Sequence, residues 1–208
     1  MRVTKNTHAC IRFEGDASGG VLVVDPGAFG ERNALDGADA VLITHEHPDH
    51  LDVELLRAHL HRHPRTQVYA HPDVLKHLPG SPVTPGDRFT AAGFTISVHG
   101  GQHAEIFPEI PRIPNVGFLI DDGAHSVYVP GDSLEVPDAT VDTLFVPFTA
   151  PWLKLSESID FVRAVKPGRA FAVHDGLVNA TGAKVYDGHL ERFSGCEYRH
   201  LPAGSVLP

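Results

Sequence analysis

Three histidines and an aspartate lie within six positions in the first quarter of the chain, in segment 45–50, which reads His-Glu-His-Pro-Asp-His. Imidazole and carboxylate groups are the usual protein ligands of first-row divalent metals. The segment directly follows the apolar run 40–43, which predicts a short buried strand ending in a ligand-rich loop. Because the chain contains 15 histidines, the case for a metal site depends on spacing and placement rather than on number.

Three further candidate ligands come later in the chain, each after an apolar run of the kind that forms a strand. They are His103 after residues 94–98, Asp132 after residues 126–129, and His174 after residues 170–173. In layered α/β proteins, functional residues collect at strand ends, where loops converge on one edge of a sheet. We therefore expect these three side chains to meet the histidine-rich loop.

Together the candidates comprise five imidazoles and two carboxylates, a donor set that suits two divalent metals, each with an open position. His45 and His47 alternate along an extended loop and so project to one side. One arrangement divides the whole set: His45, His47 and His103 bind one metal, Asp49, His50 and His174 bind the other, and Asp132 bridges the two.

The elements that must position these residues are predicted by apolar periodicity and by turn residues. The expected elements are a hairpin from runs 7–13 and 21–25 around turn 15–20, strand 40–44, helix 51–63, strand 68–70, a short helix 73–78, strands within 87–98, a hairpin from 116–120 and 126–129, strand 143–146, helix 156–166, strand 170–173, a helix within 178–193, and strand 197–201. Hairpins come first and strands then alternate with helices, twice over. This order indicates an α/β sandwich with mixed sheets and helices outside.

Composition limits the classes of function. With 208 residues, a net charge of −9 and no run of Lys or Arg, the chain is expected to bind no nucleic acid. Cys10 and Cys196 form no CxxC motif and fit buried thiols in a reducing compartment. No apolar segment approaches 18 residues and no signal-type core follows the first five. We expect a cytoplasmic protein with one domain over residues 1–208 and no membrane partner.

The order of these residues resembles the metallo-β-lactamase superfamily: the motif at 45–50, then His103, Asp132 and His174, with Asp25-Pro26-Gly27 upstream. All of the ligand positions of that superfamily match, and the resemblance extends from about residue 7 to 201. The chain is most similar to the ascorbate-6-phosphate-lactonase-like metal-dependent hydrolases. The resemblance implies a four-layer αβ/βα sandwich with two mixed β-sheets and helices outside.

The resemblance also implies a dinuclear hydrolase in which a metal-bridging hydroxide attacks a small-molecule ester, lactone or phosphoester. Zn²⁺ is the expected metal, with Mn²⁺ or Fe as alternatives. Asp49 would be both a ligand and the catalytic residue that orients the nucleophile or takes its proton. Asp25 would accept a hydrogen bond from the histidine loop and fix ligand geometry, although it could equally cap the next turn.

Two residues are candidates for a substrate pocket: His99, which lies four residues before His103, and Trp152, which follows a predicted strand on the same sheet edge. Ordinary local packing would explain each of them equally well. Two other functions stay open: a phosphodiesterase or nuclease of the same fold, and a non-catalytic metal-binding regulatory protein. A redox role is not expected, because it would need a flavin-bearing partner domain and more carboxylate in the metal site. The lactonase-like resemblance is compatible with a homo-oligomer.

Overall fold

Two seven-stranded sheets lie face to face in the computed structural model, which describes residues 1–15 and 19–208. In spatial order, the first sheet contains β14 (Ser205–Val206), β1 (Arg2–Lys5), β2 (Ile11–Glu14), β3 (Val21–Val24), β4 (Ala40–Ile43), β5 (Gln67–Ala70) and β6 (Ser81–Pro82). The second contains β13 (Glu197–Arg199), β12 (Arg169–Val173), β11 (Thr143–Pro147), β10 (Ser126–Val129), β9 (Val116–Asp121), β8 (Phe94–Gly100) and β7 (Arg88–Ala91).

Both sheets are mixed in the same way. From β14 to β3 neighbouring strands run antiparallel, and from β3 to β6 they run parallel. The second sheet repeats this pattern, with antiparallel pairs from β7 to β10 and parallel pairs from β10 to β13. The prediction of hairpins followed by crossover connections, twice over, is therefore confirmed.

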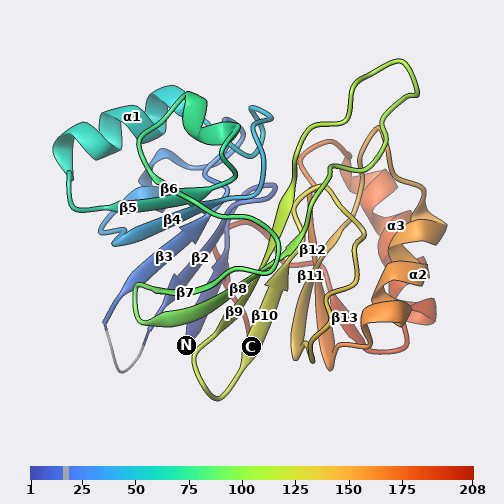
Figure 1. The fold of residues 1–208 in the computed structure, drawn as a ribbon. Coiled ribbons are helices and arrows are strands. Elements are labelled where there is room, and N and C mark those ends of the chain that lie inside the picture. Colours follow the sequence, from blue (N-terminus) through green and yellow to red (C-terminus); the bar gives the residue numbers. More distant parts are fainter. Residues whose placement is uncertain (16–18) are drawn as a thin grey trace.

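Three α-helices form the outer layers (Figure 1). Helix α1 (Val53–Arg62) covers the first sheet, whereas α2 (Leu155–Val165) and α3 (Ala180–Phe193) cover the second. Short 3₁₀ helices span Arg32–Leu35 and Val74–Lys76. The predicted four-layer αβ/βα sandwich is confirmed.

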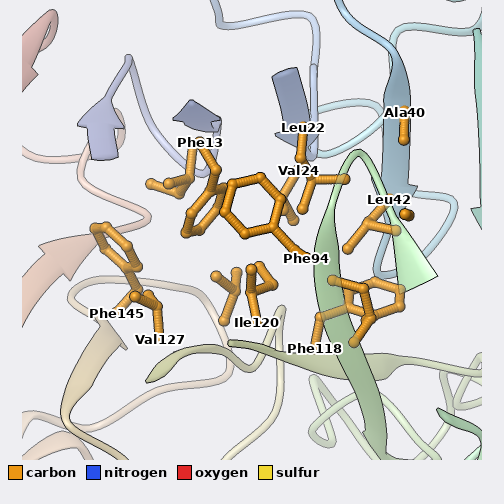
Figure 2. Packing of buried hydrophobic residues seen from close by; sticks show 14 of the residues in the cluster. Phe13, Leu22, Val24, Ala40, Leu42, Phe94, Phe118, Ile120, Val127 and Phe145 are labelled. Atoms are coloured by element: carbon orange, nitrogen blue, oxygen red, sulfur yellow. The ribbon is translucent and has the colours of Figure 1, made fainter. Parts of the chain in front are cut away.

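The main core lies between the two sheets, where Phe13 and Leu42 of the first sheet meet Phe94, Phe118 and Phe145 of the second (Figure 2). Strands β2 and β8 bury every second residue, as expected for strands with one face in a core. Two smaller apolar clusters fill the spaces between each sheet and its helices. The sheets are thus held rigidly enough for loops at one shared edge to keep fixed positions.

The helices begin where polar side chains satisfy their first backbone N–H groups. The Asp52 carboxylate accepts from Leu55 N at 2.9 Å at the start of α1, and the Asn179 side chain accepts from Gly182 N at 2.9 Å at the start of α3. Helix α1 ends just before Pro64, which cannot continue it. The predicted helix limits are correct to within about two residues.

Some expected elements differ from those observed. The predicted strand at 7–13 begins only at Ile11, because residues 6–10 form a turn in which Asn6 N donates to Cys10 O. The short helix expected at 73–78 is a single 3₁₀ turn. Strands β1, β6 and β14 were not predicted; each has four residues or fewer. The predicted turn at 15–20 falls partly on residues 16–18, outside the described residues.

No helix in the described part of the chain is long and apolar enough to cross a bilayer.

Candidate metal centre

The predicted ligands follow β4, β8, β10 and β12 and converge at one edge of the sandwich. They fall into two groups, and within each group one potential ligand atom per residue lies within 4.8 Å of the others. The first group is His45, His47, His103 and Asp132, and the second is His8, Asp49, His50 and His174. Apart from His8, this is the division expected from the sequence.

Asp132 lies between the two groups. Its Oδ2 is 3.2 Å from His103 Nε2 in the first group and 3.3 Å from His174 Nε2 in the second. Its Oδ1 is 3.1 Å from Nε2 of His50, also in the second group. Asn115, which is fully buried, holds the backbone here: its side chain accepts from Asp132 N at 3.0 Å and donates to Pro130 O at 2.9 Å. Asp132 is therefore a carboxylate within 3.3 Å of histidine nitrogens from both groups.

In His103 and His174, the hydrogen bond made by Nδ1 decides whether Nε2 can bind a metal. Nδ1 of His103 faces Ala104 O at 2.6 Å, and Nδ1 of His174 faces Thr149 O at 2.6 Å. Because a carbonyl oxygen only accepts, Nδ1 carries the proton of the neutral ring in both cases, which leaves the lone pair of Nε2 for a metal. This tautomer is the one seen in histidines whose Nε2 binds a metal.

Four buried polar atoms at this edge have no well-aligned hydrogen-bond partner among the described residues: Nε2 of His50, His103 and His174, and Oδ1 of Asp132. Each lies 3.1–3.3 Å from another polar atom of the two groups. A poorly satisfied buried polar atom costs about 1–3 kcal/mol, and such clusters are rare in native proteins. All four atoms can act as electron-pair donors and belong to the two ligand groups. The residues therefore fit a pair of divalent cations, which would satisfy these atoms at once.

The charges in the metal-free centre are strongly coupled. Burial works against ionisation of Asp132, but the facing His50, with hydrogen bonds from His103 and His174, holds its pKa well below the usual range. Burial likewise opposes a charge on His174, yet hydrogen bonds to Asp132 and Asp49 raise its pKa to about 9. The centre thus retains protons that a bound metal would displace, so metal uptake should release protons.

Asp25 holds both the histidine loop and the end of β4, which leads into it. This carboxylate is fully buried and accepts from His50 Nδ1 at 2.8 Å, Thr44 N at 2.8 Å and Thr44 Oγ1 at 2.7 Å. Since the Thr44 hydroxyl proton goes to Asp25, its oxygen is left to accept from His45 Nδ1 at 3.0 Å. Asp25 thereby orients one histidine of each group, the role that the resemblance implied.

The turn after Asp25 packs directly against the ligand loop. Ala28 N donates to Pro48 O at 2.7 Å, and Asp52 N donates to Pro26 O at 3.0 Å. A Cβ atom added to Gly27 would lie 1.9 Å from the backbone oxygen of Asp49. Only glycine lets these two backbones approach so closely.

Gly27→Ala is therefore expected to displace the ligand loop, lowering the free energy of unfolding by about 1–3 kcal/mol and weakening metal binding about tenfold. Urea unfolding and calorimetric metal titration would measure these two effects. Gly188 in α3 is the matched control, since a Cβ there meets nothing within 4 Å. Gly188→Ala should leave metal binding unchanged, and equal losses in both variants would contradict the packing argument.

His8 is a residue of this centre that the sequence prediction missed. Its ring is 1% exposed and lies 4.0 Å from the ring of His174, centroid to centroid. Its Nε2 is 3.1 Å from Asp49 Oδ2, and burial, the largest influence, lowers its pKa. Nothing in the sequence marked it beyond its being a histidine, because His8 falls at the start of the predicted strand 7–13 and not after a strand.

The two candidate pocket residues occupy different places. Trp152 Nε1 donates to Asp132 Oδ2 at 2.9 Å, and its ring lies 5.9 Å from that of His103. His99 lies on the face of β8 turned away from the inter-sheet core, where its nearest ring is Tyr128 at 5.9 Å. His99 belongs to neither ligand group. Trp152 thus borders the centre, whereas the substrate role of His99 stays a prediction.

Beside the centre, a partly buried ionic network joins the two sheets. Asp175 accepts from Lys5 Nζ of β1 at 2.7 Å and from His200 Nε2 at 2.9 Å. The other nitrogen of His200 faces Asp187 at 3.1 Å, and Tyr198 also donates to Asp187. The hydrogen bond to Asp175 raises the pKa of His200, and Asp187 raises it further against the effect of burial.

The protonated form of His200 should therefore stabilise the fold. Its contribution, about 1–2 kcal/mol for a charged hydrogen bond, is fully present below the ordinary pKa of 6.5 and is lost as pH rises through the raised folded value. Urea unfolding of wild type and His200→Gln at several pH values should show their difference shrinking as pH rises. His61→Gln, on the exposed face of α1, is the control and should show no such trend.

Comparisons with known proteins agree with the fold. The family described as beta-lactamase superfamily domain matches residues 2–174. Protein Rv0786c of Mycobacterium tuberculosis is 38% identical over 212 residues, covering 100% of this chain and 99% of that protein. Igni18, a metallo hydrolase from Ignicoccus hospitalis, has a TM-score of 0.76 at 16% identity, covering 99% of this chain and 97% of that one. CmlA, a diiron β-hydroxylase from Streptomyces venezuelae, has a TM-score of 0.75 at 17% identity, covering 99% of this chain and 53% of that one.

Proposed function

Because this chain belongs to the beta-lactamase superfamily and gathers two groups of histidine and aspartate side chains at one edge of its sandwich, we propose that it is a dinuclear metal-dependent hydrolase of small-molecule esters, lactones or phosphoesters. The observation that carries the proposal is Asp132, whose carboxylate lies within 3.3 Å of a histidine Nε2 from each group.

Each side chain has a distinct part in this proposal. The first metal is held by His45, His47 and His103, the second by Asp49, His50 and His174, and both by Asp132. Two metals in these positions would lower the pKa of a bound water and polarise the carbonyl or phosphoryl oxygen of the substrate. Asp49 has the most exposed of the three carboxylates, at 20% against 4% for Asp132 and 0% for Asp25. Asp49 is thus the carboxylate best placed to orient the attacking water and accept its proton.

The rim of the centre favours a substrate with an apolar group. Phe29, Phe107, Ile110 and Leu177 are about half exposed and lie on loops that border the ligands. The Phe29 ring is 5.1 Å from that of His8, and Ile110 lines a small pocket together with His47. Apolar side chains exposed next to such a centre are most simply explained as contacts for substrate.

The charges of the rim argue against a phosphorylated substrate. The ligand-bearing loops 44–52, 101–115, 130–142 and 174–179 contain one Arg and no Lys. That residue, Arg112, donates through Nε to His103 O at 2.7 Å. A phosphate group is normally bound by several cations or backbone donors, so we propose that carboxylic esters or lactones are preferred over phosphodiesters. Lactone hydrolysis as in the lactonases that the chain resembles, but without their phosphorylated substrate, and the predicted cytoplasmic location are part of the same proposal.

Chelation tests the proposal most directly. Prolonged dialysis against a chelator should abolish turnover in a panel of aryl esters, lactones and a phosphodiester, and two equivalents of Zn²⁺ or Mn²⁺ should restore it. Elemental analysis of the purified protein should give two metals per chain and identify the native metal. Iron is among the metals to test, because CmlA, which has this fold, is a diiron enzyme. Full activity after metal removal would contradict a metallohydrolase. Two bound metals with no turnover across the panel would favour a non-catalytic metal-binding protein.

A further inference from the structure

His8 is close enough to the second group to bind a metal there. Whether it does depends on which of its ring nitrogens carries the proton. The ring nitrogens meet two fixed partners. Gly176 N donates to Nδ1 at 3.0 Å, and Nε2 lies 3.1 Å from Asp49 Oδ2. A backbone N–H can only donate, so Nδ1 must offer its lone pair and cannot carry a proton.

It follows that the proton of the neutral ring is on Nε2. A ring nitrogen that carries a proton has no lone pair for a cation, so this nitrogen donates to Asp49 instead. The arrangement is the reverse of that in His103 and His174, where Nδ1 faces a carbonyl oxygen and Nε2 is left free. The four surrounding donors and acceptors therefore distinguish two kinds of histidine within one cluster.

The backbone of His8 is held as firmly as its ring. Its φ of 62° lies in the left-handed region, which costs energy for a residue with a side chain. His174 N donates to His8 O at 3.1 Å, so the residue is tied to the end of β12 through its carbonyl as well as through its ring. His8 thereby connects three segments: the turn between β1 and β2, the ligand loop, and the loop after β12.

We propose that His8 is a positioning residue, which donates from Nε2 to Asp49 and so fixes this carboxylate for the second metal, and that it is not itself a ligand. A carboxylate oxygen has two lone pairs, so Oδ2 of Asp49 accepts from His8 and keeps one for a cation. The inference rests on the proposed function only in treating Asp49 as a ligand.

Two substitutions separate the positioning role from a ligand role. In His8→Gln, the side-chain amide is long enough to donate to Asp49 in place of Nε2. In His8→Asn, the amide oxygen can accept from Gly176 N, but the side chain is too short to reach Asp49. We expect the second metal to bind about 10–100-fold more weakly in His8→Asn and within about threefold of wild type in His8→Gln, with the first metal unaffected in both. Equal loss of the second metal in both variants would overturn the proposal.

Nuclear magnetic resonance of the zinc-loaded, ¹⁵N-histidine-labelled wild-type protein gives a readout that needs neither variant to fold. We expect Nε2 of His8, assigned by through-space contacts to the His174 ring at 4.0 Å, to show a directly bonded proton. An unprotonated Nε2 with a metal-bound shift would make His8 a ligand and refute the proposal. Because this measurement reports ring protonation and not turnover, a protein that hydrolyses nothing would contradict the proposed function and leave the test of His8 intact.

Discussion

Replacing Asp132 with asparagine is expected to lower kcat/KM by about 10³-fold or more and to reduce bound metal from two per chain to one or none. An amide cannot carry the negative charge that two adjacent cations require, although its shape and its contact with the Trp152 indole could be kept. Steady-state kinetics on the best ester of the panel and elemental analysis would measure the two effects together.

Asp138 provides the control for this substitution, because it lies six residues further along the same loop and is exposed. Asp138→Asn should keep both metals and full activity. If Asp132→Asn also kept two metals and a normal rate, Asp132 would not bridge the groups and the proposed dinuclear chemistry would be wrong.

Replacing Asp25 with alanine is expected to cost more stability than any other single substitution among the supporting residues of the centre. It would leave the buried donors of His50 and Thr44 without an acceptor, a loss of about 3–5 kcal/mol when one partner of a buried charged interaction is removed. Metal affinity should fall about 10–100-fold, because the His50 and His45 rings lose their orientation. Chemical unfolding and metal titration would give the two values.

Asp25→Asn refines this prediction. Asparagine tolerates the left-handed φ of 50° found at this position and keeps one acceptor oxygen, so an intermediate loss is expected. Asp36→Ala removes an exposed carboxylate from the following 3₁₀ turn and should change neither property by more than about 0.5 kcal/mol. An Asp25→Ala protein as stable as Asp36→Ala would show that the turn, and not the carboxylate, holds the loop.

The ligand groups could be predicted because their residues are both chemically distinctive and placed by simple rules. His45 and His47 directly follow an apolar strand, and His103, Asp132 and His174 each follow another. Strand β4 belongs to one sheet and β8, β10 and β12 to the other, so periodicity located the strand ends, and the tendency of functional residues to collect at strand ends predicted that they meet. The two layers of helices followed from helical spacing in the same way.

Apart from Asp25, the supporting roles could not be predicted, since they depend on contacts between distant segments. His8 lies in a tight turn with a left-handed backbone, and its ring partners come from residues 49 and 176. Asn115 and Trp152 each make one hydrogen bond to Asp132, and no local sequence pattern predicts either bond. Strands β1, β6 and β14 are short edge or near-edge strands whose pairing is decided by tertiary packing.

The repeated strand order of the two sheets has a consequence for how the chain folds. Within each sheet, nearly all neighbouring strands are also consecutive in the chain, so each sheet can form from local pairings, and only β14 crosses back to the other half. The first half supplies the ligands from His45 to His50, and the second supplies His103, Asp132 and His174. The candidate metal centre therefore lies where the two halves of the chain meet. A metal held by residues of both halves would stabilise their association, so we expect calorimetric unfolding of the metal-free protein to be less cooperative than that of the metal-loaded protein.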